Sequence, residues 1–177
     1  FEMFDPSPSI AYNGAMPSDA FAITSVRSPE DLAATMALFE AYAASLGINL
    51  SYQNCVEEMA AMPGKYAPPK GERLLARDRR GAAIGCVGLR PLADDGVCEM
   101  KRLYVAPEGR GVGLGKALAE AIVREARRIG YREMRLDTLP SLVAAIALYE
   151  RMGFAAIPAY YDTPIAGTLF FSLPLSP

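Results

Sequence analysis

The sequence predicts a mixed α/β fold, with a central, mostly antiparallel sheet of about six or seven strands and about four helices on its faces. Two observations indicate this class. Strand-like segments joined by tight turns come first, and alternating strand and helix segments follow them. The length of 177 residues suits one core, and 51% of the residues are hydrophobic. We expect residues 1–20 to form a tail or arm and residues 21–177 to form one domain.

The first half of the chain contains the segments that predict hairpins. A short strand is expected near 21–27, and a helix over 29–46 is predicted by apolar residues at helical spacing. Ser28 and Pro29 provide its N-cap and first turn, and a shorter helix is expected over 51–61. Strands joined by the turns DRRG and ADDG are expected over 73–77, 82–89 and 97–105.

The second half alternates between helices and strands. A helix is expected from about Gly113 to Ile129, with apolar residues on one face and Gly130 at its end. The elements that follow are a strand over 134–138, a helix over 141–152 ended by Gly153, and strands over 154–157 and 168–173. This order favours a mixed sheet with helices on its faces.

The composition excludes several kinds of site. The chain has no histidine, which rules out a Ser-His-Asp triad, a Cys-His pair and every histidine-bearing metal site within it. We expect no metal, and any general base must be a carboxylate, a lysine, a tyrosine or a water that they position. The net charge of −2 argues against a nucleic-acid partner.

Cysteine usage and hydropathy predict the compartment. Cys55, Cys86 and Cys98 form no CxxC pair, and the last two lie in apolar runs where cysteine packs as a small hydrophobe. No apolar run reaches the roughly 20 residues that span a bilayer, so we expect no membrane partner. The first residues lack a basic end followed by an apolar stretch, and a cytoplasmic location is the expectation.

A glycine-rich turn is the most specific feature of the sequence. A strand ends at Val105, and the turn into the next helix carries glycines at 109, 111, 113 and 115. A helix N-terminus presents unpaired N–H groups and partial positive charge, and glycine lets an anion approach the backbone closely. Arg110 and Lys116 add positive charge, so the turn predicts a phosphate site.

The spacing within the turn narrows the phosphate ligand. A nucleotide P-loop needs GxxxxGK followed by Ser or Thr, but Lys116 is followed by Ala117. A dinucleotide fingerprint needs GxGxxG, and its last position falls on Leu114 or Lys116. Asp137, where a ribose-binding acid could lie, keeps a dinucleotide site as an alternative, as does a glycine-rich turn without a ligand.

The pattern that fits is RxxGxG over residues 110–115, which follows Val105-Ala106-Pro107. It resembles motif A of the GNAT superfamily of acyl-CoA-dependent N-acyltransferases. The segment LYERMGF, from Leu148 to Phe154, resembles motif B of the same family. The expected element order matches that family from about Phe21 to Leu173, so the resemblance covers most of the chain.

The resemblance implies a function and a set of donor contacts. It implies an N-acetyltransferase that moves the acetyl group of acetyl-CoA directly to a primary amine of a small molecule in a ternary complex. The backbone of Leu103, Tyr104 and Val105 would pair with the pantetheine arm, and one of their amides would stabilise the developing oxyanion. The pyrophosphate would be held by the amides of Arg110, Gly111, Val112, Gly113, Leu114, Gly115 and Lys116. Leu142 stands where many relatives carry an asparagine.

Two side chains are candidates for moving protons. The resemblance implies that Tyr149 protonates the departing thiolate, although it could also be an ordinary buried aromatic. Glu99 lies on the strand that should line the cofactor, and it could accept a proton through a water. The alternatives for Glu99 are a cross-strand salt bridge and a solvent-facing strand position, and strand alternation, which places Lys101 on the same face, favours them. Asp137 could cap the next helix or contact substrate.

The acceptor side has fewer signals. Tyr160, Tyr161 and Asp162 lie in a proline-bordered loop that could cover the acceptor pocket or form a packed hairpin corner. Two other functions remain open: a CoA-binding module without catalysis, and an acetyltransferase for protein lysines or N-termini. A homodimer is also open, since terminal strands in such folds can pair between subunits.

Overall fold

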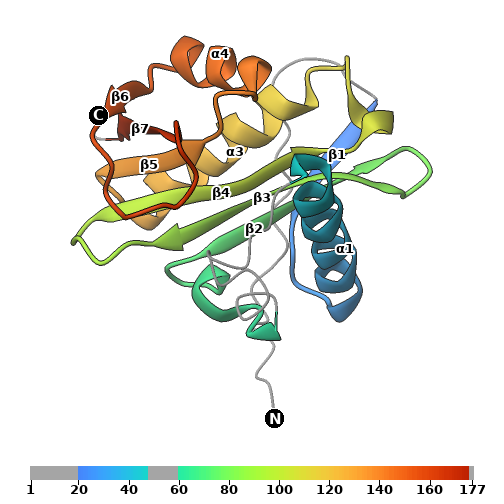
Figure 1. Ribbon diagram of the computed structural model, residues 1–177. Helices are drawn as coiled ribbons and strands as arrows, with labels where there is room; N and C mark the ends of the chain where they lie inside the picture. Colours follow the sequence, from blue (N-terminus) through green and yellow to red (C-terminus); the bar gives the residue numbers. More distant parts are fainter. Residues whose placement is uncertain (1–19, 48–59, 176–177) are drawn as a thin grey trace.

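The computed structural model describes residues 20–47 and 60–175, and these contain one seven-stranded sheet in the order β1-β2-β3-β4-β5-β7-β6 (Figure 1). Every neighbouring pair is antiparallel except β4 and β5, which are parallel. The strands are β1 (Phe21–Ser25), β2 (Glu72–Asp78), β3 (Ala83–Pro91), β4 (Val97–Val105), β5 (Glu133–Thr138), β6 (Ala155–Ile157) and β7 (Leu169–Pro174).

Helices cover both faces of this sheet. The helix α1 (Pro29–Leu46) lies over one face, while α3 (Leu114–Ile129) and α4 (Val143–Arg151) lie over the other (Figure 1). Two short 3₁₀ turns, η2 (Gly64–Tyr66) and η3 (Pro107–Gly109), precede β2 and α3. Among the residues described, no helix is both long and apolar enough to cross a membrane.

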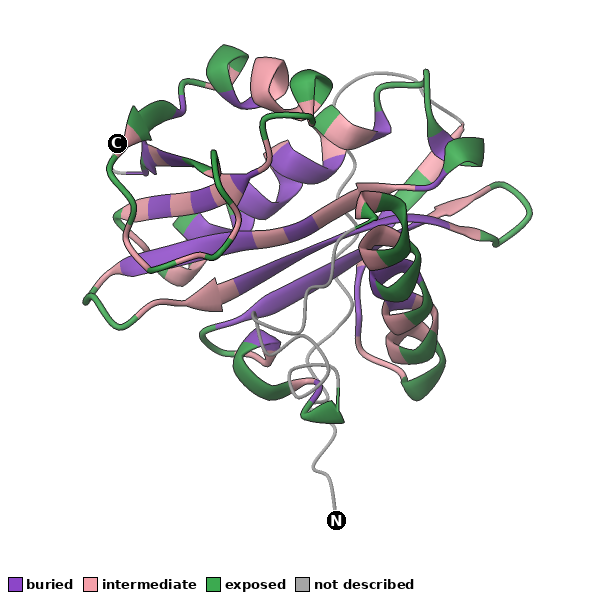
Figure 2. Ribbon diagram, in the orientation of Figure 1, coloured by how far each residue is buried: buried purple, intermediate pink, exposed green. Residues whose placement is uncertain are grey.

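The two faces bury separate apolar clusters. The larger lies under α3, where Leu118 and Ile122 pack against Leu74 and Leu89 of the sheet. The smaller lies under α1, around Phe39 and residues from β2 and β3. In Figure 2 the buried colour runs along the central strands and along the side of α3 that faces them. The central strands are therefore enclosed on both faces.

The structure confirms the predicted fold class and the element order. The helix α1 begins after an N-cap in which Ser28 Oγ accepts a hydrogen bond from the amide of Asp31, 3.0 Å away, and it ends at Gly47 in the left-handed conformation. Both predicted hairpins are present, and β4 has the predicted bounds. The described residues contain three α-helices against about four expected. The helix expected over 51–61 lies almost entirely on residues outside the described ranges, and Cys55 also lies outside them.

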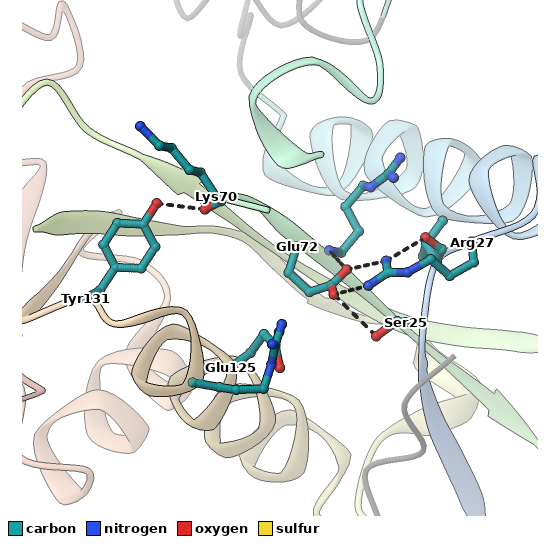
Figure 3. Close-up of polar contacts among 9 residues, drawn as sticks. Ser25, Arg27, Lys70, Glu72, Glu125 and Tyr131 are labelled. Carbon is teal, nitrogen blue, oxygen red and sulfur yellow. Dashed lines mark hydrogen bonds and ion pairs between the residues drawn. The ribbon is translucent and has the colours of Figure 1, made fainter. Parts of the chain in front are cut away.

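A buried ion pair fastens β1 to β2 at the end away from the glycine-rich turn. Glu72, with 1% of its side chain exposed, accepts hydrogen bonds from Arg27 Nη1 at 2.7 Å and Nη2 at 2.5 Å. Ser25 Oγ lies 3.4 Å from the same carboxylate (Figure 3). A buried carboxylate needs such partners, because desolvation of an unpaired charge is expensive.

The sheet divides between β4 and β5. Their ladder consists of the pairs Val97–Glu133, Cys98–Met134 and Glu99–Arg135, and no further pair joins the two strands within the described residues. Beyond Glu99, β4 continues to Val105 beside β3, whereas β5 continues to Thr138 beside β7. The parallel strands therefore separate toward their carboxyl ends and leave an opening in the sheet.

Candidate active site

One cavity of about 880 Å³ occupies the opening between β4 and β5. Its walls come from the C-terminal end of α1, the C-terminal half of β4, the glycine-rich turn, the end of β5 and α4. Tyr42 lines it from α1, and Gly111 and Gly113 line it from the turn. A single space thus reaches both the glycine-rich turn and the face of the sheet that α1 covers.

The glycine-rich turn adopts the conformation that its sequence predicts. Gly111 has φ 82° and Gly113 has φ 79°, and the latter is the N-cap of α3. A Cβ atom at either position would meet no atom within 4 Å, so the positive φ, and not crowding, requires glycine there. Because the N-cap residue is a glycine, no side chain caps the helix N-terminus, and the amides there keep their capacity to bind an anion.

Most of the residues predicted to bind the acyl donor line the cavity, and two do not. Arg110 lines it, and its Nε donates to the Val105 carbonyl at 3.3 Å. Val112 is exposed, and Lys116 lies with its Nζ 3.6 Å from a carboxylate oxygen of Glu120 on the surface of α3. The other predicted residues of the turn and strand that line it are Leu103, Tyr104, Val105, Gly111, Gly113, Leu114 and Gly115.

The C-terminal half of β4 offers backbone groups to the cavity. Tyr104 and Val105 pair with Cys86 and Gly85 of β3 on one edge. On the other edge, the ladder to β5 ends at Glu99. Because strand hydrogen bonds alternate between the two edges, this second edge can pair with an extended ligand in place of a strand.

Tyr149 reaches the cavity from α4. Its side chain is 6% exposed, and its ring packs against Phe154 and Phe171 at centroid distances of 5.8 and 6.4 Å. Burial raises the pKa of Tyr149, and the negative charges that Tyr42 and Asp137 can carry raise it further. The phenol therefore keeps its proton at neutral pH. Tyr149 is therefore a core aromatic whose protonated phenol also lines the cavity.

Glu99 is held away from the cavity. Its carboxylate is 1% exposed and accepts hydrogen bonds from Arg90 Nε at 2.8 Å and the Tyr160 hydroxyl at 2.6 Å. Arg90 and Glu99 are opposite one another on β3 and β4, which matches the cross-strand salt bridge that was the alternative for this residue. Glu99 is absent from the cavity wall, so a base role would require a route through its neighbours.

Lys101 and Asp137 are the charged pair that does line this opening. Lys101 Nζ lies 2.5 Å from Asp137 Oδ1 and 3.6 Å from Glu99 Oε1. Both side chains are 11% exposed. Strand alternation predicted that Lys101 would lie beside Glu99. Nothing in the sequence predicted that Lys101 would also form an ion pair with Asp137 on β5.

The loop after β6 closes over the same polar cluster. The Tyr161 hydroxyl donates to Asp137 Oδ2 at 3.0 Å, and the rings of Tyr160 and Tyr161 each stack edge-on against Phe170. The two tyrosines thus pack as a hairpin corner and also position both carboxylates. Asp162 is exposed and does not line the cavity.

Neither described cysteine has a reactive environment. Cys86 and Cys98 are buried, and burial raises the pKa of both thiols, that of Cys98 to about 12. Both cysteines pack in the core, as predicted. Within residues 20–47 and 60–175, no three Cys, Asp or Glu side chains gather where they could hold a metal ion.

The divided sheet and the helix N-terminus beside its opening suit an acyltransferase that uses a coenzyme A thioester. The model of the acetyltransferase (GNAT) family matches residues 36–154, and the chain belongs to that family. It is 42% identical over 154 residues to an uncharacterised N-acetyltransferase of Schizosaccharomyces pombe, covering 87% of this chain and 94% of that protein.

Other similarities agree with this assignment. The chain is 30% identical to the N-acetylaspartate synthetase of Danio rerio, over 71% of this chain and 45% of that protein. Among solved structures, a protein of Klebsiella pneumoniae described as a proposed acyl-CoA N-acyltransferase has a TM-score of 0.71 at 29% identity. That match covers 90% of this chain and 100% of the other. The protein is an acyltransferase, and its fold implies the use of acetyl-CoA.

Proposed function

We propose that the protein transfers the acetyl group of acetyl-CoA to the primary amine of a small molecule, directly and within a ternary complex. The observation that carries this proposal is the continuity of the cavity. It extends from the glycine-rich turn, past the open edge of β4, to Tyr42 of α1. Donor and acceptor can therefore enter from different ends and meet between β4 and β5.

The donor end fits the proposed thioester ligand. The amides at the start of α3 and the guanidinium of Arg110 suit a pyrophosphate. The open backbone edge at Leu103, Tyr104 and Val105 suits an extended arm that contains amides, and an amide there would polarise the thioester carbonyl. Leu142 lines the cavity and provides no polar side chain.

We propose Asp137, in place of Glu99, as the group that receives the proton from the attacking amine. Asp137 lines the cavity, and its carboxylate has more acceptor sites than Lys101 and Tyr161 occupy. Glu99 is enclosed by Arg90 and Tyr160, and its role would be to hold Lys101 in place. The amine thus loses a proton as its bond to the acyl carbon forms.

Tyr149 would supply the proton for the departing thiolate. Its raised pKa keeps the phenol protonated, and it lines the same cavity as Asp137. The two groups would act as general base and general acid: the carboxylate takes a proton from the nucleophile, and the phenol gives one to the leaving group. No nucleophilic side chain is needed, which agrees with direct transfer.

The names of several relatives support a small acceptor. They include N-acetylaspartate synthetases from fish and rat and an IAA acetyltransferase of Azospirillum brasilense. The competing acceptors are lysine side chains and N-termini of proteins. The competing function without chemistry is a module that binds CoA only.

An amine panel tests the proposal. Release of CoA thiol from acetyl-CoA is followed with small amines and amino acids, and in parallel with peptides that present an N-terminus or a lysine. We expect turnover with at least one small amine and initial-rate plots that intersect, as a ternary complex requires. Parallel plots would contradict direct transfer. Calorimetric binding of acetyl-CoA without turnover would indicate the binding module, and turnover only with peptides would contradict the small acceptor.

A further inference from the structure

Lys101 lies on the face of β4 that α1 covers, where the pairing with β5 has already ended. Met100 belongs to the apolar cluster under α3, so strand alternation directs Glu99 and Lys101 to the opposite face. Regular alternation stops at the next residue, Arg102, which has a φ of 55° and lies with its guanidinium carbon 5.4 Å from the ring centroid of Phe39 on α1. Lys101 is therefore the last regular residue of β4 before a β-bulge, and it faces the opening of the sheet.

The ammonium group of Lys101 is shared by two carboxylates. Its Nζ lies 2.5 Å from Asp137 Oδ1 and 3.6 Å from Glu99 Oε1. The side chains of Lys101 and Asp137 are 11% exposed and that of Glu99 is 1% exposed, so water screens these charges little. Glu99 is held from two other sides, because Arg90 Nε donates to it at 2.8 Å and the Tyr160 hydroxyl donates to it at 2.6 Å. The resting arrangement thus pairs Lys101 with Asp137 and keeps Glu99 as a second, fixed anion within reach.

The proposed reaction removes the charge of one of these carboxylates. As the amine nitrogen forms its bond to the acyl carbon, an N–H bond breaks and the proton passes to Asp137, which becomes a neutral acid. Lys101 then keeps its positive charge with little solvent around it, and an unpaired cation in such a place is costly. Glu99 takes no part in that proton transfer. A lysine ammonium on its flexible stem can turn from one anion to the other.

We propose that Lys101 is a positioning residue that shifts its ion pair from Asp137 to Glu99 when Asp137 receives the proton of the amine. This inference rests on the proposed function, with Asp137 as the base. Collapse of the intermediate then breaks the C–S bond, and the sulfur takes a proton from Tyr149. The proton on Asp137 returns through water to that phenolate, and Lys101 returns to Asp137. Glu99, which is buried and absent from the cavity wall, would thus keep the cation paired throughout the cycle.

Crystal structures of the wild type and of Asp137→Asn provide the first arm of the test. The amide has the shape of the carboxyl group without its charge, so it stands for the protonated base. We expect the distance from Lys101 Nζ to Glu99 Oε1 to be near 3.6 Å in the wild type. In the variant it should shorten to hydrogen-bond range, about 2.7–3.2 Å. An unchanged distance would overturn the inference. This arm needs no turnover, so it decides even where failure of every acceptor contradicts the proposed function.

A double-mutant cycle on kcat provides the second arm. Lys101→Met removes the charge and keeps the length of the side chain, and Glu99→Gln removes the second anion. We expect kcat to fall by about 30-fold or more for Lys101→Met and by about 3- to 10-fold for Glu99→Gln, with the acceptor KM and the Kd of acetyl-CoA within about threefold. The double variant should be no slower than Lys101→Met, because Glu99 acts only through that cation. Losses that multiply would overturn the inference.

The control is Arg77→Met, which removes a cation from an ion pair with Asp31 that does not line the cavity. It should keep kcat within about twofold, since a partly exposed pair contributes little. Circular dichroism checks the folding of each variant. A rise in the acceptor KM as the main effect of Lys101→Met would mean that Lys101 binds the acceptor, and this too would overturn the inference. If Lys101→Met fails to fold, the crystal structures of the first arm still decide.

Discussion

Lys101 Nζ lies 2.5 Å from Asp137 Oδ1 across the opening where β4 and β5 no longer pair. The pair joins two strands that exchange no backbone hydrogen bonds at this level. It also brings a cation and a carboxylate to the wall of the cavity, and the Tyr161 hydroxyl fixes the second carboxylate oxygen at 3.0 Å. The contact thus bridges the divided sheet and places polar groups at the wall of the cavity.

Asp137→Asn should lower kcat by a factor of about 10² to 10⁴, because the amide cannot receive a proton. Glu99→Gln should cost less if Glu99 only positions Lys101. The measurement is thiol release at saturating donor, with circular dichroism to confirm folding. Asp95→Asn is the control, since the Asp95 side chain is 99% exposed in the β3–β4 turn. A larger loss for Glu99→Gln than for Asp137→Asn would return the base role to Glu99.

Tyr149→Phe should lower kcat by about 10- to 100-fold while leaving the Kd of acetyl-CoA unchanged, because only the hydroxyl is removed. The pH profile provides a second readout. Burial raises the pKa of Tyr149 above its ordinary value of about 10, so the acid form persists as pH rises. The wild-type kcat should therefore show no alkaline loss from this residue below about pH 10. An unchanged kcat in the variant would remove Tyr149 from the mechanism.

Gly113→Asn and Gly113→Asp separate backbone effects from charge at the helix N-terminus. Both residues tolerate a positive φ, and the added Cβ meets no atom within 4 Å, so both variants should fold. Asn should keep the affinity for acetyl-CoA within about tenfold, whereas Asp should weaken it by a further tenfold or more through repulsion of phosphate. Calorimetry at two salt concentrations measures this, since screening should reduce the penalty for Asp. Equal affinities for the two variants would refute the assignment of the turn to phosphate.

Arg27→Met tests the buried pair at the far end of the sheet. Its removal leaves the Glu72 carboxylate, which is 1% exposed, without its guanidinium partner, so the free energy of unfolding should fall by about 3–5 kcal/mol. The matched control is Arg77→Met. Arg77 pairs with Asp31 at 2.9 Å, but both side chains are about a quarter exposed, and that loss should stay below about 1 kcal/mol. Urea denaturation gives both values, and equal losses would contradict the role of burial.

Local signals predicted most of the fold. Ser28 and Gly47 mark the ends of α1, the turns mark the hairpins, and the glycines at 111 and 113 mark the backbone conformation at the start of α3. Each signal acts within a few residues, which is why the sequence alone sufficed. The donor turn belongs to this group.

The acceptor side depends on contacts that are distant in sequence. Lys101 and Asp137 are 36 positions apart, and Glu99 meets Tyr160 across 61 positions. No glycine marks the positive φ at Arg102, so strand alternation alone gives the wrong face for its side chain. Pairing between distant strands determines these positions, and periodicity carries no information about it.

The three-pair ladder between β4 and β5 has a mechanical consequence. Within residues 20–47 and 60–175 it is the only strand pairing that joins β1–β4 to β5–β7–β6, so bending between the two halves should concentrate there. A ligand that pairs with the free edge of β4 would extend that seam. We therefore expect hydrogen exchange at amides of both halves to slow when the donor binds, beyond the residues that it touches. The bound acyl donor would thus stabilise the divided sheet in addition to taking part in the reaction.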